Sequence, residues 1–217
     1  FFAFVPLLIL ESQAKNGREI FCLSFCSFFI FNSITTYWVW HATNVGAVFA
    51  FFINSVLMSL VFYLYFHVKR KISNKLGFFS LICLWVSMEY MHLNWDLSWP
   101  WLTIGNVFAK YPIIVQWYEF TGFLGGSFWV ILINLLVFNF LHGQKKKRNF
   151  LQLLVALLLP IIFSLYINIS YTENRGNWST STSVAKGRFN QKNIKFTNIF
   201  RAEPPIDSKY HFGSRLV

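Results

Sequence analysis

The chain has 217 residues, of which 55% are hydrophobic, 21% aromatic and only 12% charged. Soluble domains carry about 25% charged residues, so the composition excludes an ordinary soluble domain and indicates that lipid is the main solvent. A net charge of +11 would suggest nucleic acid as the partner of a soluble protein. Here the basic residues lie in short loops and in the last quarter of the chain, so membrane topology explains much of the charge and no nucleic-acid partner is expected.

Six apolar runs follow one another along the chain, at residues 1–10, 20–40, 45–68, 76–93, 118–141 and 150–170. The last five are 18 to 24 residues long, which is enough to cross a bilayer as a helix. The first is too short to span, and because the chain starts with Phe-Phe we expect a fragment cut within a helix. The sequence predicts an all-α, polytopic transmembrane helix bundle with about five full spans plus a partial first one.

The distribution of Lys and Arg over the connecting loops predicts the orientation of the bundle. Ten such residues lie in alternate loops, at 11–19, 69–75 and 142–149. The intervening loops, 41–44 and 94–117, hold only Lys110. By the positive-inside rule the first set is cytoplasmic, and loop 94–117 and the chain after residue 170 are external. Six of the nine tryptophans, which favour the interface, also lie at this predicted outer boundary: Trp38, Trp40, Trp95, Trp99, Trp101 and Trp117.

Residues 171–217 differ in composition from the membrane part at 1–170. They hold eight basic and three acidic residues among Asn, Ser and Thr, with no strong hydrophobic period. Eight external basic residues run against the positive-inside rule. The sequence therefore predicts a poorly defined external C-terminal tail, either a separately translocated segment or one that is not the natural continuation of the membrane part, for example after a frame disruption.

A series of short motifs in a fixed order resembles the membrane half of the apolipoprotein N-acyltransferase family. The residues that carry the resemblance are Phe4-Val5-Pro6-Leu7-Leu8, Asn32, Thr35-Thr36-Tyr37-Trp38, Glu89-Tyr90, Trp99-Pro100-Trp101-Leu102, Gly105-Asn106, Gln116-Trp117, Gly122, Gly125-Gly126-Ser127 and Asn134. The resemblance covers about residues 1–170. It implies a multi-pass protein of the bacterial inner membrane, with the tail in the periplasm.

The resemblance also implies a reaction and its partners. Members of the family carry a periplasmic nitrilase-like domain with a Glu–Lys–Cys triad, whose cysteine takes an acyl chain from a phospholipid and passes it to the diacylglyceryl-cysteine of a lipoprotein. Splitting one acyl transfer into two steps is the usual gain of a covalent nucleophile. The phospholipid donor and the lipoprotein acceptor are therefore the expected partners, beside membrane lipid.

The tail departs from this family pattern. Neither the Gln-Pro-Asn nor the Pro-Glu expected of the catalytic domain follows Tyr171, and no cysteine follows Cys83. Residues 171–217 are interpreted as the start or remnant of that domain, no catalytic residue is assigned, and we expect the chain as given to be inactive alone. Cys22, Cys26 and Cys83 are interpreted as small apolar residues in lipid, and no metal or cofactor is expected.

Glu89 is the single Asp, Glu, Lys or Arg residue in the run 76–93. An ionised carboxylate costs about 2.5–3.5 kcal/mol at mid-bilayer and less near the interface. Glu89 is interpreted either as the lining of a lipid-accessible cavity or as a structural partner between helices. His92 lies three positions further on, so the two side chains can meet on a helix, either for proton chemistry or in a structural hydrogen bond.

The linker after Glu89 supplies the other candidate site residues. Pro100 disfavours helix in the residue before it, so Trp99 and Trp101 form either an interfacial turn or a wall of the acyl entrance. Gln116 and Glu119 open the next helix, where the helix dipole alone would account for Glu119. We expect Glu89, Trp101 and Gln116 to converge on one external-side cavity. The candidate lining set is Glu89, Trp99, Trp101, Gln116 and Glu119.

Two further patterns have mainly structural interpretations. Gly122, Gly125 and Gly126 are small residues that allow close helix approach. The run 145–148, Lys-Lys-Lys-Arg, is a topology determinant, with binding of anionic headgroups as the alternative.

Two other classes of function stay open. One is a non-enzymatic membrane module that binds lipid or a partner through loop 94–117. The other is a transporter built around Glu89, which ranks last because transporters usually show further intramembrane charges or paired broken helices.

Overall fold

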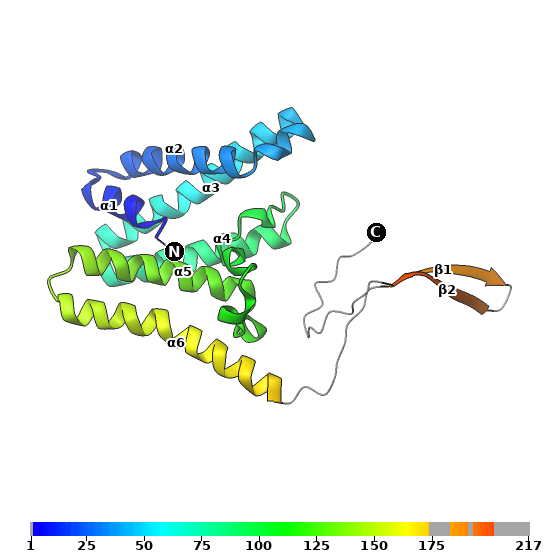
Figure 1. Cartoon of the computed structure of the whole chain (residues 1–217). Helices are drawn as coiled ribbons and strands as arrows, with labels where there is room; N and C mark the ends of the chain where they lie inside the picture. Colours follow the sequence, from blue (N-terminus) through cyan, green and yellow to red (C-terminus); the bar gives the residue numbers. More distant parts are fainter. Residues whose placement is uncertain (1, 174–182, 191–192, 202–217) are drawn as a thin grey trace. The chain divides into compact units, whose positions relative to one another are not determined.

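The computed structural model describes residues 2–173, 183–190 and 193–201 and falls into two compact units, Phe1–Ile167 and Asn168–Val217. The elements, labelled in Figure 1, are α1 Val5–Gln13, α2 Gly17–Thr35, η1 Tyr37–His41, α3 Asn44–Lys71, α4 Asn74–Asn94, η2 Pro100–Leu102, η3 Ile104–Phe108, η4 Pro112–Val115, α5 Tyr118–His142, α6 Lys146–Glu173, β1 Ser183–Asn190 and β2 Asn193–Arg201, the η elements being 3₁₀ helices. Five helices, α2 to α6, are long and apolar enough to cross a membrane. The predicted all-α polytopic bundle is confirmed.

Short polar side chains fix where three of the spanning helices begin. Asn16 accepts a hydrogen bond from the Glu19 amide before α2. Thr43 and Ser73 cap α3 and α4 in the same way. These oxygens satisfy amides that have no partner within the helix, so the turns between the spans lie close to the boundaries predicted from hydropathy.

The short first apolar run forms the nine-residue helix α1. Pro6 lies in its first turn, where its missing amide hydrogen costs no hydrogen bond. The amide of Phe4 donates to the Asn134 side chain on α5 at 3.0 Å, and Leu8 is fully buried. The predicted partial helix is therefore packed into the bundle.

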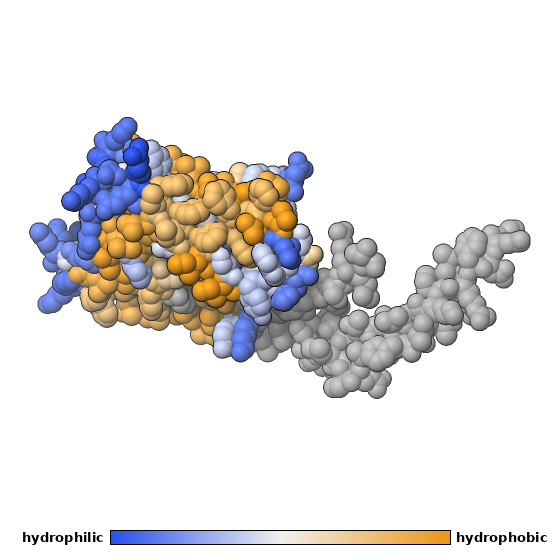
Figure 2. Space-filling view, turned by 90° about the horizontal axis from the view of Figure 1, so that it is seen from above, coloured by the Kyte–Doolittle hydropathy of each residue, from blue (hydrophilic) through white to orange (hydrophobic). Residues whose placement is uncertain are grey.

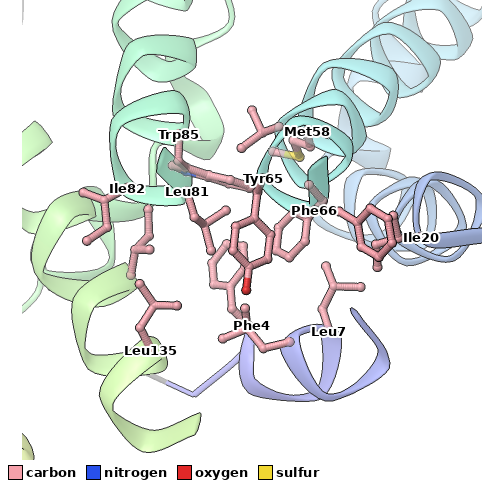
Figure 3. Packing of buried hydrophobic residues seen from close by; sticks show 14 of the residues in the cluster. Phe4, Leu7, Ile20, Met58, Tyr65, Phe66, Leu81, Ile82, Trp85 and Leu135 are labelled. Carbon is pink, nitrogen blue, oxygen red and sulfur yellow. The ribbon is translucent and has the colours of Figure 1, made fainter. Parts of the chain in front are cut away.

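The core of the bundle is rich in aromatic residues and lies where α1, α2, α3, α4 and α5 meet (Figure 3). Phe4 stands edge-on to Trp85 with ring centroids 4.8 Å apart, and Phe28 lies 5.7 Å from the same ring. Asn32 on α2 also donates to Ser55 on α3 at 3.2 Å. Because lipid is as apolar as these side chains, close packing and such interhelical hydrogen bonds, about 0.6 kcal/mol each on average, hold the helices together.

The outer face of the bundle is apolar. Figure 2 shows hydrophobic residues over most of the visible face of the membrane unit, with hydrophilic residues gathered toward its ends. The helices differ in how much they contribute to the interior. In the most apolar stretch of α5, 50% of the residues are buried, and in that of α6 only 11%. A face of this kind is expected where lipid, not water, surrounds the helices.

Two glycines of α5 have different structural roles: Gly122 allows an unusual backbone conformation, and Gly126 allows a close contact with a loop. Gly122 has φ of 64°, a left-handed conformation that glycine adopts without strain, and it divides the first turn of α5 from the rest. A Cβ on Gly126 would lie 3.0 Å from the Cα of Gly105 in η3. Gly126 thus lets loop 94–117 approach α5, whereas the sequence suggested close approach of two helices.

The second unit contains an antiparallel hairpin of β1 and β2, in which Asn190 pairs with Asn193 and Ser183 with Arg201. The ladder is irregular between Val184 and Ala185. The sequence predicted no regular structure in the tail, so the hairpin is a difference from that expectation. The remaining tail residues, 174–182, 191–192 and 202–217, lie outside the described part of the chain.

Candidate functional site

Glu89 is the centre of a buried polar cluster near the C-terminal end of α4. Its side chain is 4% exposed. The indole Nε1 of Trp85, one helical turn earlier, donates to Glu89 Oε1 at 2.9 Å. The backbone amide of Ile104, in loop 94–117, donates to the same oxygen at 2.9 Å. Glu89 therefore joins α4 to the loop.

Two residues of α5 form hydrogen bonds with Gly105, the loop residue next to Ile104. The amide of Gly105 donates to Ser127 Oγ at 2.9 Å, and the hydroxyl of Tyr118 donates to the Gly105 carbonyl at 2.9 Å. With the Glu89 contact, these bonds fix the start of η3 to both α4 and α5. An irregular backbone at membrane depth is tolerated when protein satisfies its polar groups, and this arrangement does so.

A small cavity of about 10 Å³ lies beside Glu89. It is lined by Asn54, Met58, Met88, Glu89, His92, Trp99, Leu102 and Thr103. Three buried polar atoms of this lining, Glu89 Oε2, His92 Nδ1 and Trp99 Nε1, have no hydrogen-bond partner within the described residues. Buried polar atoms are normally paired, so the cavity offers an unused acceptor, an indole donor and an imidazole nitrogen to one small polar group.

The structure brings two of the five candidate site residues to this cavity, Glu89 and Trp99. His92, the third residue of interest, lines it as well. No hydrogen bond joins Glu89 to His92 in the described part of the chain, and the His92 ring instead lies edge-on to Trp95 at 5.3 Å. The two side chains share the cavity without forming a direct pair.

The other three candidates lie elsewhere along the loop and α5. Trp101 is 63% exposed, and its ring stands edge-on to Trp38 at 5.5 Å. Gln116 is buried and donates to the Pro112 carbonyl at 2.9 Å. Glu119 is exposed in the first turn of α5. None of these three is among the cavity-lining residues of the described chain.

Four contributors to the cluster were not singled out from the sequence. Trp85 lies four positions before Glu89, a spacing that places both on one helix face, so this contact could have been found. Ser127 ends the Gly-Gly-Ser motif, which gave a weaker signal. Tyr118 and Thr103 gave none, because their positions depend on how the loop folds.

The cysteines lie outside this cluster. Cys22, Cys26 and Cys83 form no disulfide and are exposed on α2 and α4. Thiolate formation is disfavoured in apolar surroundings, so a cysteine on a spanning helix is a poor nucleophile.

The sequence model of the apolipoprotein N-acyltransferase N-terminal domain matches residues 1–136, which is more than half of the chain. The chain belongs to the apolipoprotein N-acyltransferase family. The match includes Glu89, the external loop and the part of α5 that holds it, so the cluster lies within the family domain.

Individual relatives agree with this assignment. The apolipoprotein N-acyltransferase of Chlorobaculum tepidum is 29% identical over 166 residues, covering 75% of this chain and 31% of the relative. That of Geobacter metallireducens is 25% identical over 217 residues, covering 93% of this chain and 41% of the relative. That of Borreliella burgdorferi is 26% identical, covering 73% and 30%. The chain thus spans only about a third of the length of these relatives. No solved structure matches it.

Proposed function

We propose that residues 1–170 are the membrane part of an enzyme that moves an acyl chain from a phospholipid to the N-terminal diacylglyceryl-cysteine of a lipoprotein. The proposed location is the bacterial inner membrane, with loop 94–117 and the tail on the periplasmic side. The observation that carries the proposal is the family match over residues 1–136. The names of the relatives supply the reaction class, and the five spans supply the membrane setting.

In this proposal the Glu89 cluster supports a substrate path at the outer end of the bundle. The bonds from Glu89, Tyr118 and Ser127 hold the loop in one conformation. Trp99 forms part of the buried wall, and Trp101 presents its exposed ring at the rim. A fixed rim is useful because rigid support for a binding site lowers the entropy lost when a lipid chain binds.

Gln116 and Glu119 complete the proposed rim. Gln116 stabilises the turn before α5 through the Pro112 carbonyl, and Glu119 carries a charge at the exposed start of α5. We further propose that residues 171–217 occupy the position of the catalytic domain, and that a polypeptide limited to these 217 residues does not transfer acyl chains, since its three cysteines all lie on spanning helices.

A chimera tests this function. Residues 1–170 would replace the aligned membrane part of the Chlorobaculum tepidum relative, in a strain depleted of its own N-acyltransferase. We expect triacylated lipoprotein by mass spectrometry from the chimera, and none from the 217-residue chain or from the relative's remaining part alone. A chimera that inserts in the membrane but yields only diacylated lipoprotein would favour the second candidate, a non-enzymatic lipid- or partner-binding module.

A further inference from the structure

A second cavity, of about 440 Å³, lies at the opposite, basic end of the bundle. Its lining includes Glu11, Ser12, Lys69, Arg70, Phe138 and His142. Its volume is in the range of small-molecule sites, about 300–1,000 Å³. It lies where α1, the end of α3 and the end of α5 come together. The Glu89 cluster lies at the other end of the spans.

A buried carboxylate organises this cavity. Glu11 is fully buried, forms an ion pair with the ammonium group of Lys69 and accepts a hydrogen bond from the Tyr65 hydroxyl at 3.1 Å, all through Oε2. Its other oxygen, Oε1, is buried and has no partner in the part of the chain that the structure describes. A fully buried carboxylate oxygen usually meets a donor, so this side of the cavity can accept a hydroxyl or other hydrogen-bond donor of a ligand, but not an anionic oxygen.

The cation of Lys69 is held in place from several sides. Its Nζ lies 5.4 Å from the centre of the Tyr65 ring, and 5.6 Å from those of Phe78 and Phe138. Cation–π contacts at such distances are attractive. Because Glu11 already balances this charge, Lys69 and Glu11 together form a neutral, rigid wall.

Arg70 adds a charge that is not balanced by an acidic partner within the described residues. One guanidinium nitrogen donates to the Ala14 carbonyl at 2.9 Å, and the group stacks over the Phe66 ring at 5.0 Å. A guanidinium has five N–H donors in a planar fork that suits phosphate oxygens. His142, exposed at the end of α5, donates to the Phe138 carbonyl through Nδ1 at 3.3 Å. Its Nε2 is the nitrogen left at the rim, and it can donate to a phosphate when the ring is protonated.

The surroundings favour an anion that also has an apolar part. The same end of the bundle carries Lys71 at the end of α3, Lys75 in the first turn of α4 and the basic run 145–148 at the start of α6. Basic pockets between helices bind phospholipid headgroups in other membrane proteins. Phe78 and Phe138 make part of the wall apolar, which suits the first carbons of the acyl chains.

We propose that this cavity binds the phosphate of a membrane phospholipid, with Arg70 as the principal phosphate ligand and His142 at the rim. The glycerol and the upper acyl chains lie against Phe78 and Phe138. The bound lipid is a structural ligand at the end of the bundle opposite to the external loop. This proposal does not depend on the proposed acyl transfer. Free inorganic phosphate shares the headgroup chemistry, and the experiment separates the two.

Native mass spectrometry of the purified full chain with added phosphatidylglycerol tests the proposal. Arg70→Gln removes the phosphate ligand, and Ser12→Phe fills the cavity without a change of charge. We expect Arg70→Gln to reduce retained lipid about tenfold, the effect of losing one charge-assisted hydrogen bond, and Ser12→Phe to reduce it by occupying the space of the headgroup. Lys75→Gln is the matched control: it removes the same charge at the same end, from an exposed residue outside the cavity lining, and should retain lipid as the parent does.

Three results would overturn the proposal. One is an equal loss of lipid in Lys75→Gln and Arg70→Gln, because the attraction would then be diffuse. Another is stabilisation against heat by inorganic phosphate but not by phosphatidylglycerol. The third is unchanged lipid retention in Ser12→Phe. The last variant leaves the Arg70–Ala14 bond in place, so it decides the question if Arg70→Gln fails to fold.

Discussion

At the scale of single residues, Glu89 shows how a carboxylate is tolerated inside a spanning helix. Two N–H donors from protein, Trp85 Nε1 and the Ile104 amide, reach its Oε1 at 2.9 Å. The cost of an intramembrane carboxylate falls when it is buried in protein and paired. Glu89 therefore joins α4 to loop 94–117, whatever further role the second oxygen has.

Replacing Glu89 by an apolar side chain should destabilise the bundle. In Glu89→Leu, two buried donors lose their acceptor, at about 1–3 kcal/mol for each. Glu89→Gln keeps an oxygen in place and should cost much less. Thermal unfolding in detergent, followed by intrinsic fluorescence, measures the difference. Asp96→Leu, an exposed acidic residue of the same loop, is the control, and an equal effect of the two leucine variants would contradict the prediction.

The small cavity beside Glu89 should hold one ordered water molecule. Its volume of about 10 Å³ is at the lower limit for a single water, about 10–15 Å³. Glu89 Oε2, His92 Nδ1 and Trp99 Nε1 provide the two to four polar partners that a buried water needs. A high-resolution experimental structure would show it as a density peak within hydrogen-bond distance of at least two of these atoms. A dry cavity in such a map would refute the prediction.

The sequence could identify Glu89 as unusual, but only part of its surroundings. A carboxylate in an apolar run is visible in any hydropathy plot, and Trp85 lies at a helical spacing from it. The Ile104 amide lies fifteen positions away, and backbone donors leave no trace in residue type. Trp101 had two interpretations, an interfacial turn or a wall of the acyl entrance. Its ring is exposed and contacts Trp38, a contact that no local pattern indicates.

At the scale of elements, loop 94–117 is fixed to α5 by close backbone contact. A Cβ on Gly105 would lie 1.8 Å from the Phe123 carbonyl oxygen, so even a methyl group must displace α5 or the loop. We expect Gly105→Ala to cost about 1–3 kcal/mol, as overpacking usually does. The neighbouring exposed variant Asn106→Ala should be close to neutral. Limited proteolysis of loop 94–117 measures its anchoring, and equal cleavage of both variants would count against the prediction.

The link between α5 and α6 depends on a proline. Pro160 has no amide hydrogen, which leaves the carbonyl four residues earlier without its helical donor. That carbonyl, of Ala156, accepts a hydrogen bond from Trp129 Nε1 at 2.7 Å. The indole thus replaces the missing backbone donor, and it joins two helices of which one, α6, has little buried surface.

A double-mutant cycle tests this link. Trp129→Phe removes the donor and should cost about 1–3 kcal/mol, because a partly buried carbonyl is left unpaired in a segment that lipid surrounds. In a Pro160→Ala background the restored amide hydrogen can serve the Ala156 carbonyl, so the same Trp129→Phe change should cost less. Thermal unfolding of the four proteins gives the coupling energy. Additive effects would show that the Trp129 bond is independent of the proline.

At the scale of the whole molecule, apolar length predicted the membrane unit well and residue patterning predicted the tail poorly. A run of about 20 apolar residues has few other stable forms in lipid, and the helix boundaries follow. In the hairpin, apolar and polar residues alternate from Ile194 to Thr197 and then the pattern breaks at Asn198-Ile199. The strand register shifts at this point, since Val184 pairs with Phe200 and Ala185 with Asn198. A bulge of this kind adds one residue and interrupts the period of two.

Orientation in the membrane is the last property that the chain's charges predict. Ten Lys and Arg residues lie in loops 11–19, 69–75 and 142–149, and one in the loops between them, so the first set should be cytoplasmic. The test uses a background without the three native cysteines and a membrane-impermeant thiol reagent on cells with a permeabilised outer membrane. Ser98→Cys should react and Lys147→Cys should not, until the inner membrane is opened by detergent. Reaction of the second position alone in closed cells would invert the topology, and it would place the Arg70 cavity, with its basic surroundings, on the periplasmic side.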